Sequence, residues 1–179
     1  MPRYAALLRG INVGRSARIG MTDLRALLGQ IGYSDVATYL QSGNAVFTCP
    51  HARPEVPARE VEGALRERLG ISVRCLIRDR DELQAVIAGN PLAGVATDGA
   101  RFLAFFLSDN PRPELLAARD PAALDPERIR LGDRVLYQWC PDGVLAAPAV
   151  GAFVEKHLGV TVTARNWNTV TRLAAMLEA

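Results

Sequence analysis

A loop rich in glycine and arginine near the N-terminus offers the first groups that could bind a ligand. Residues 9–16 have the sequence Arg-Gly-Ile-Asn-Val-Gly-Arg-Ser and lie between a predicted strand and a predicted helix. In that position backbone N–H groups favour an anion, and glycine lets a ligand approach the main chain. The alternative is an exposed glycine loop with solvated arginines. The ligand-binding interpretation assigns roles to Arg9, Gly10, Asn12 and Gly14.

This loop resembles a phosphate-binding P-loop without satisfying its pattern. A P-loop has four residues between its glycines, followed by Lys and then Ser or Thr. Here three residues separate Gly10 from Gly14, and Arg15 stands where lysine is needed. The sequence therefore excludes nucleotide hydrolysis of the P-loop type.

Two further motifs combine amides and hydroxyls. Residues 41–44, Gln-Ser-Gly-Asn, favour a hairpin turn and also present uncharged donors and acceptors beside a sheet end. Residues 165–169, Arg-Asn-Trp-Asn-Thr, precede a predicted helix, where an asparagine is a natural cap. The same position suits an anion or a stacked base. The predicted ligand-binding residues of these motifs are Gln41, Ser42, Asn44, Arg165, Asn166, Trp167 and Asn168.

Groups that transfer protons or bind metals are missing from all three motifs, which contain no His, Asp, Glu, Cys or Lys. Neither His51 nor His157 has cysteines or carboxylates at metal-ligand spacing. Neither Ser16 nor Ser42 has an evident partner base. We therefore predict no metal and no cofactor, assign no catalytic residue and favour binding over catalysis.

The overall charge conceals a basic segment. The 179 residues include 21 Lys+Arg and 19 Asp+Glu, and 49% are apolar, which excludes a disordered chain and a disulfide scaffold. Residues 1–25 nevertheless contain one acidic residue, Asp23, and five arginines. A nearly neutral chain of this kind is not a general nucleic-acid-binding protein, but its basic segment could hold one anionic group.

Cysteine usage and hydropathy predict a cytoplasmic protein. The three cysteines, Cys49, Cys75 and Cys140, form no C-x-x-C motif, as expected in a reducing compartment. No apolar run approaches the roughly 20 residues that cross a bilayer, and the N-terminus has no signal-peptide pattern. We predict no membrane association.

The first half has the pattern strand, helix, strand, strand, helix, strand. Gly32 and Gly70 end the two helices, and Gly43-Asn44 is predicted as a two-residue turn between the middle strands. This βαββαβ order is that of ferredoxin-like folds. The predicted strands cover 4–8, 36–42, 45–49 and 71–78. Thr22 is the predicted cap of the first helix, and Pro57 opens the second.

The second half repeats this order. Gly132-Asp133 is its predicted turn and Gly159 ends its second helix. Pairs such as Gly43 and Gly132, Gly70 and Gly159, and Val73 and Val162 are each separated by 89 residues. The first strands are 98 residues apart, which places nine extra residues in loop 9–20. We predict an α+β protein with two ferredoxin-like halves, residues 1–90 and 91–179, that arose by internal duplication.

Three segments resemble the bacterial domain-of-unknown-function 1697 family. They are RGINVG at 9–14, YLQSGNAVF at 39–47 and RNWNTVTRLAAML at 165–177. The resemblance extends over the whole length and implies a two-part, ferredoxin-like α+β protein without an established activity. The chain departs from the family at Arg15 and Arg18, where relatives often have a second glycine and a later lysine.

The three motifs together suggest one polar site that binds an anionic ligand without catalysis. The ligand would be a nucleotide, a phosphorylated metabolite or a short nucleic acid. Two alternatives stay open. One is a small-molecule enzyme that stabilises its transition state through arginine and amide donors. The other is a protein-interaction module whose motifs brace the two halves. The sequence does not indicate an oligomeric state.

Overall fold

The computed structural model describes residues 1–15 and 17–179, so the interpretation of the Ser16 hydroxyl lies outside the described residues. The chain divides into two compact units. Unit 1 comprises Met1–Leu83 and Leu173–Ala179, and unit 2 comprises Gln84–Arg172. The division falls within two helices, α3 (Arg80–Ala88) and α6 (Trp167–Glu178).

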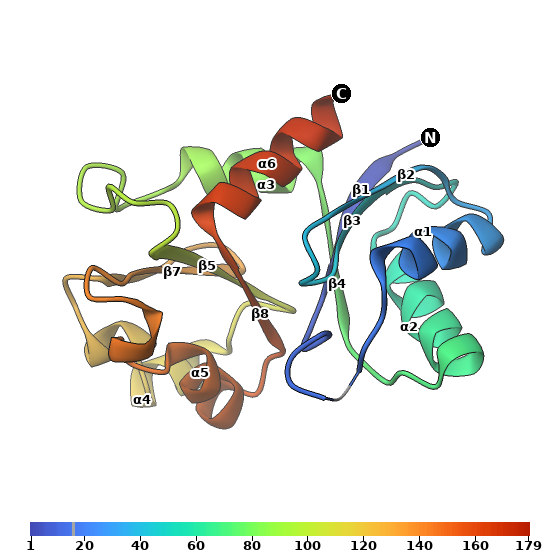
Figure 1. Cartoon of the computed structure of the whole chain (residues 1–179). Helices are drawn as coiled ribbons and strands as arrows, with labels where there is room; N and C mark the ends of the chain where they lie inside the picture. The colour runs from blue at the N-terminus through green and yellow to red at the C-terminus, as the bar shows by residue number, and fades with distance from the viewer. Residues whose placement is uncertain (16) are drawn as a thin grey trace. The chain divides into compact units, whose positions relative to one another are not determined.

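Unit 1 is a four-stranded antiparallel sheet with two helices on one face (Figure 1). The strand order is β2-β3-β1-β4. Apolar residues at helical spacing, such as Leu24 and Leu28 of α1 and Val61 and Leu65 of α2, pack with Phe47 in its core. The elements are β1 (Arg3–Leu8), α1 (Met21–Gln30), β2 (Ser34–Tyr39), β3 (Asn44–Thr48), α2 (Glu55–Leu69) and β4 (Cys75–Asp79).

Unit 2 has the same architecture, with strand order β6-β7-β5-β8 and antiparallel neighbours. Val154 and Leu158 of α5 pack against Phe105 and Leu136 of the sheet, and Leu115 of α4 joins them. The elements are β5 (Phe102–Leu107), α4 (Pro113–Ala118), β6 (Ile129–Leu131), β7 (Val135–Trp139), α5 (Val150–Leu158) and β8 (Val162–Asn166), with short 3-10 helices at Pro121–Leu124 and Val144–Ala146.

The predicted fold class is therefore confirmed. Both units are α+β with the βαββαβ order, and their similarity fits a duplication. Helices α2 and α5 end alike, because Gly70 and Gly159 both adopt the left-handed conformation, with φ of 65° and 66°. The 89-residue spacing predicted for these two glycines holds at this point.

The spacing differs elsewhere, because the connections of the two copies differ in length. The Leu8 N–H bonds to the carbonyl of Gly43, and the Leu107 N–H bonds in the same way to Arg134. Gly43 therefore corresponds to Arg134 and not to Gly132. Residues 70–74 separate α2 from β4, whereas residues 159–161 separate α5 from β8, so the predicted pairing of Val73 with Val162 is also wrong.

Several predicted boundaries are corrected. The turn before β3 is Leu40–Gly43, with φ of 59° at Leu40 and 89° at Gly43, so it is longer than the predicted Gly43-Asn44 turn. Gly20, not Thr22, precedes α1 as its cap. The last strand extends to Asn166, which places Arg165 in a strand and not in a loop.

Candidate functional site

Asn12 organises the loop between β1 and α1. Its backbone has a φ of 54°, which asparagine tolerates better than most residues. Its side-chain Nδ2 donates to the carbonyls of Ile19 (2.8 Å) and Gln41 (2.7 Å), and its Oδ1 accepts from the Ile19 N–H (2.9 Å). The Asn12 amide therefore holds both ends of the loop, while the exposed Arg9 and Arg18 flank it.

The second motif packs against this loop, so the structure brings the first two motifs together in unit 1. Gly43 is buried, and a Cβ added there would lie 2.8 Å from Leu8 Cβ and from Ile11 Cδ1. Only glycine fits this contact. Asn44 is fully buried and donates to the carbonyl of Tyr39 (2.9 Å) and to Ser42 Oγ (3.0 Å). Both motifs thus have clear structural roles.

The third motif belongs to unit 2. Asn166 Oδ1 accepts from the Thr169 N–H (3.0 Å) and caps α6, as the sequence suggests. Trp167 is half-buried, and its ring centroid lies 4.7 Å from that of Phe102. Asn168 is exposed and lies against Gly99. That this motif shares one site with the first two stays a prediction.

Arg165 is buried, and the structure reveals a counterpart that the sequence analysis missed. Arg165 in β8 pairs with Ala104, and Arg78 in β4 pairs with Ala5, at corresponding positions of the two sheets. Each arginine donates from Nη1 to the carbonyl of its preceding residue, Ile77 (2.9 Å) or Ala164 (2.8 Å). Arg165 Nη1 also bonds to Thr163 Oγ1 (2.8 Å). This shared geometry is a further sign of duplication.

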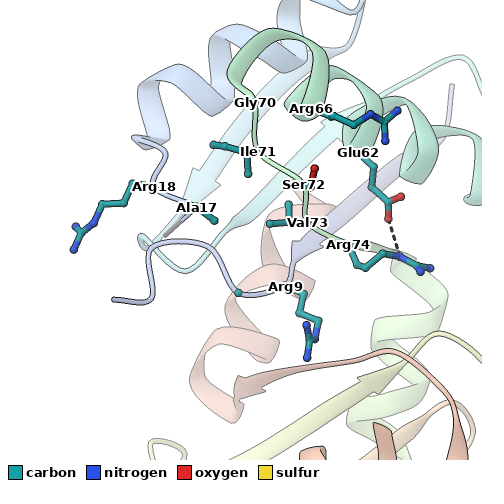
Figure 2. A pocket seen from close by; sticks show the side chains of 11 residues that line it. Arg9, Ala17, Arg18, Glu62, Arg66, Gly70, Ile71, Ser72, Val73 and Arg74 are labelled. Atoms are coloured by element: carbon teal, nitrogen blue, oxygen red, sulfur yellow. Dashed lines mark hydrogen bonds and ion pairs between the residues drawn. The ribbon is translucent and has the colours of Figure 1, made fainter. Parts of the chain in front are cut away.

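A cavity of about 660 Å³ lies in unit 1, where the chain leaves β1 and where it approaches β4 (Figure 2). Its charged lining residues are one glutamate, Glu62, and four arginines, Arg9, Arg18, Arg66 and Arg74. We call it the basic cavity. Gly10 also lines it, so two predicted residues of the first motif contribute directly.

The fold explains why residues distant in sequence meet here. Gly70 ends α2 and reverses the chain, with its N–H bonded to the Arg66 carbonyl (3.1 Å). The linker then runs back beside β1, where the Arg9 N–H bonds to the Arg74 carbonyl (2.9 Å). Arg66, Arg74 and Glu62 were not predicted as site residues, because they belong to no motif. The signal that could have indicated them is the βαββαβ order itself, because the first and last strands of such a sheet are neighbours.

The charged groups of the basic cavity differ in their partners. Glu62 Oε1 accepts from the Cys75 N–H (2.8 Å) and from Arg74 Nε (3.3 Å). Arg18 donates to the Gly14 carbonyl (2.6 Å). The Arg66 side chain has no hydrogen bond or ion pair with any described residue. Figure 2 shows Arg18 and Arg66 at opposite sides of the cavity and Arg74 turned towards Glu62.

The other titratable groups of unit 1 form a separate network. Tyr33 donates to Glu60, and Glu60 Oε1 lies 3.2 Å from His51 Nε2. Burial and this hydrogen bond raise the pKa of Tyr33 above its usual value, and burial raises the pKa of the Cys49 thiol. Within the described part of the chain, His, Cys, Asp and Glu nowhere gather in threes that could hold a metal ion.

Comparison with known proteins identifies the family. The family described as "Protein of unknown function (DUF1697)" matches residues 1–137. The chain belongs to this family. The match confirms the resemblance inferred from the motifs; it includes the first two motifs and ends before the third. No curated protein matches the chain.

A solved structure is similar over nearly the whole chain. It is described as that of a conserved bacterial protein from Streptococcus pneumoniae, with 22% sequence identity, coverage of 98% of each chain and a TM-score of 0.68. At this identity the similarity shows the fold alone. Over residues 1–15 and 17–179, every helix is too short or too polar to cross a bilayer.

Proposed function

We propose that unit 1 binds an anionic ligand of metabolite size in the basic cavity. Its volume of about 660 Å³ falls in the range of small-molecule sites, roughly 300–1,000 Å³. The ligand is a nucleotide, a phosphorylated metabolite or a short nucleic acid. In line with the sequence prediction, we propose a cytoplasmic location.

The observation that carries this proposal is the excess of guanidinium groups. The cavity is lined by four arginines and one carboxylate, and guanidinium groups donate in a fork geometry that matches phosphate and carboxylate. Arg74 uses Nε for Glu62, which leaves its terminal nitrogens for a ligand. Arg66 has no partner among the described residues. Both guanidinium groups can therefore bind an anion without first breaking a bond at their terminal nitrogens.

Binding is proposed in preference to catalysis because of the residue types at the cavity. Among the described residues that line it there is no histidine or cysteine, and Glu62 is the one carboxylate. Arg9 and Gly10 would contact the ligand. Asn12, Gly14, Gln41, Ser42 and Asn44 would hold the loop and its neighbouring turn in place, as their contacts indicate.

The experiment is titration of the full chain with inorganic phosphate, adenosine monophosphate, a sugar phosphate and a short oligonucleotide, followed by calorimetry. We expect at least one probe to bind, and Arg66→Ala to weaken binding about tenfold or more, as for a lost charge-assisted hydrogen bond. Binding by the oligonucleotide would weaken steeply between about 50 and 200 mM salt.

Arg59→Ala is the matched control, because Arg59 is an exposed arginine of the same helix that does not line the cavity. The Arg59→Ala variant should bind each probe with the same affinity as the unmodified protein. Absence of binding by every probe, or equal losses in the Arg66 and Arg59 variants, would refute the proposed site.

The proposed contribution of the third motif has its own test. Asn168 is exposed, so Asn168→Ala should leave the fold intact. A loss of phosphate affinity in this variant supports a contribution of the third motif (Arg165, Asn166, Trp167 and Asn168) to the proposed anion site. Unchanged affinity limits the ligand to unit 1.

A further inference from the structure

Glu62 is the one carboxylate among the described residues that line the basic cavity. Its side chain is 24% exposed. A single oxygen, Oε1, accepts both of its hydrogen bonds, from the Cys75 N–H and from Arg74 Nε. The other oxygen, Oε2, has no hydrogen-bond partner among the described residues. One acceptor atom in an otherwise basic cavity is therefore open to a ligand.

The bond to Cys75 does not account for this second oxygen. In unit 2, Glu155 of α5 accepts from the N–H of Val162, the first residue of β8, at 3.3 Å. Glu62 does the same for Cys75, the first residue of β4. Both copies thus use a helix carboxylate to anchor the start of their last strand. That anchor needs one acceptor oxygen, which a neutral amide would also provide.

The negative charge of Glu62 opposes the binding of a simple anion, because like charges at short range repel. The same charge attracts a ligand that carries a cationic donor near its anionic group. We infer that the ligand is a phosphate monoester that also bears an ammonium group, and that Glu62 Oε2 accepts a hydrogen bond from that group. This inference rests on the proposed function and specifies its substrate class.

The positions of the side chains set the separation of the two ligand groups. Glu62 and Arg66 are one helical turn apart on α2, so their Cβ atoms are about 5–6 Å apart. Arg74 contacts Glu62 directly. A phosphate on Arg66 and Arg74 would therefore lie a short spacer, such as two carbons, from an ammonium on Glu62. Ala17, Ile71 and Val73 also line the cavity and make part of its wall apolar.

The experiment compares two probes that differ in the ammonium group, phosphoethanolamine and ethyl phosphate, by calorimetry on the full chain. We expect the unmodified protein to prefer phosphoethanolamine about tenfold, because its ammonium forms a charge-assisted hydrogen bond. In Glu62→Gln the amide oxygen preserves the anchor to Cys75 while the charge is lost. The preference should then fall close to one, with ethyl phosphate binding several-fold more tightly than before.

Glu67→Gln, an exposed glutamate of α2 outside the cavity, is the control and should retain the tenfold preference. Equal binding of both probes by the unmodified protein, with equal tightening of both in Glu62→Gln, overturns the inference and leaves the proposed anion site intact. If neither these probes nor any anion binds the unmodified protein, the proposed function fails and the inference fails with it.

Discussion

The βαββαβ unit occurs twice in this chain, and the copies differ at the sheet end where the first strand lies beside the last. In unit 1 the Arg9 N–H bonds to the Arg74 carbonyl, and in unit 2 the Ser108 N–H bonds to the Thr161 carbonyl, each at 2.9 Å. The backbone hydrogen bond is the same in both units. The guanidinium side chains of Arg9 and Arg74 in unit 1 are replaced in unit 2 by the hydroxyl side chains of Ser108 and Thr161. In unit 2, Ser108 Oγ accepts from the Thr161 N–H (3.0 Å).

Other features are shared and therefore belong to the scaffold. Asn12 braces the first loop of unit 1 against the carbonyl of Gln41 in the turn before β3. Asn110 braces the first loop of unit 2 in a similar way, accepting from the Arg134 N–H (2.7 Å) and donating to Asp133 (2.7 Å). Braces of this kind stabilise the connections, and they are present whether or not arginines line the sheet end.

The comparison separates fold from function. The fold supplies the sheet end and the asparagine brace in both copies. Each copy also anchors its last strand with a carboxylate of its second long helix, but from different positions, because Glu155 corresponds to Arg66 and not to Glu62. Two features distinguish unit 1: the arginines of the basic cavity, and a longer first connection, which covers residues 9–20 in unit 1 and residues 108–112 in unit 2. The proposed binding function thus rests on side chains placed on a duplicated scaffold, as is general for folds that host different activities.

The largest expected effect comes from the two corresponding turn residues, Gly43 and Arg134. Gly43→Ala should lower the free energy of unfolding by about 2–4 kcal/mol, because its φ of 89° and the contacts with Leu8 and Ile11 exclude a Cβ. Arg134, with φ of 52°, already tolerates a side chain, so Arg134→Gly should change stability by about 1 kcal/mol or less. Urea denaturation of both variants measures the difference. Equal effects would contradict the close contacts of Gly43 with Leu8 and Ile11.

The next effect concerns the two asparagine braces. Asn12→Ala removes three hydrogen bonds and should cost about 2 kcal/mol of stability and also weaken phosphate binding, because the loop carries Arg9 and Arg18. Asn110→Ala, at an exposed position, should cost about 1 kcal/mol and leave phosphate binding unchanged. Calorimetric titration and denaturation test both outcomes. A loss of phosphate affinity in Asn110→Ala would show that unit 2 takes part in binding.

The smallest expected effect concerns His157 of unit 2. Partial burial and the charges of Arg119 and Lys156 lower the pKa of this histidine. The imidazole of His157 therefore binds a proton more readily in the unfolded chain than in the folded protein. Its protonation should lower the free energy of unfolding as the pH falls through the unfolded pKa of about 6.5. NMR titration should place the His157 pKa below that value, and Lys156→Gln should raise it. A His157 pKa at or above the usual value would contradict the effect assigned to burial and to the two nearby cations.

Periodicity and glycine positions were sufficient to predict much of the fold. Strong apolar patterns gave the order of elements in both halves, and Gly70 and Gly159 marked the ends of equivalent helices. The turns were predicted less well, because Leu40 and Arg134 adopt positive φ values that their residue types do not indicate. That residues 1–90 and 91–179 form separate domains stays a prediction.

The candidate site was predicted only in part. Arg9 and Gly10 belong to a recognisable motif, and they line the basic cavity. Arg66 and Arg74 are single arginines in a helix and a linker, and nothing local distinguishes them from other exposed arginines. They become a site only through the return of the chain after Gly70. Tertiary placement of this kind leaves no pattern in a short stretch of sequence.

The most direct test is an NMR titration of the isotope-labelled full chain with inorganic phosphate. The proposed function predicts chemical-shift changes at the residues that line the basic cavity, among them Arg9, Gly10, Arg66 and residues 70–74. It predicts none at the corresponding residues 108–112 and 155–161 of unit 2. Changes confined to unit 2, or no changes at millimolar phosphate, would contradict the assignment of anion binding to unit 1.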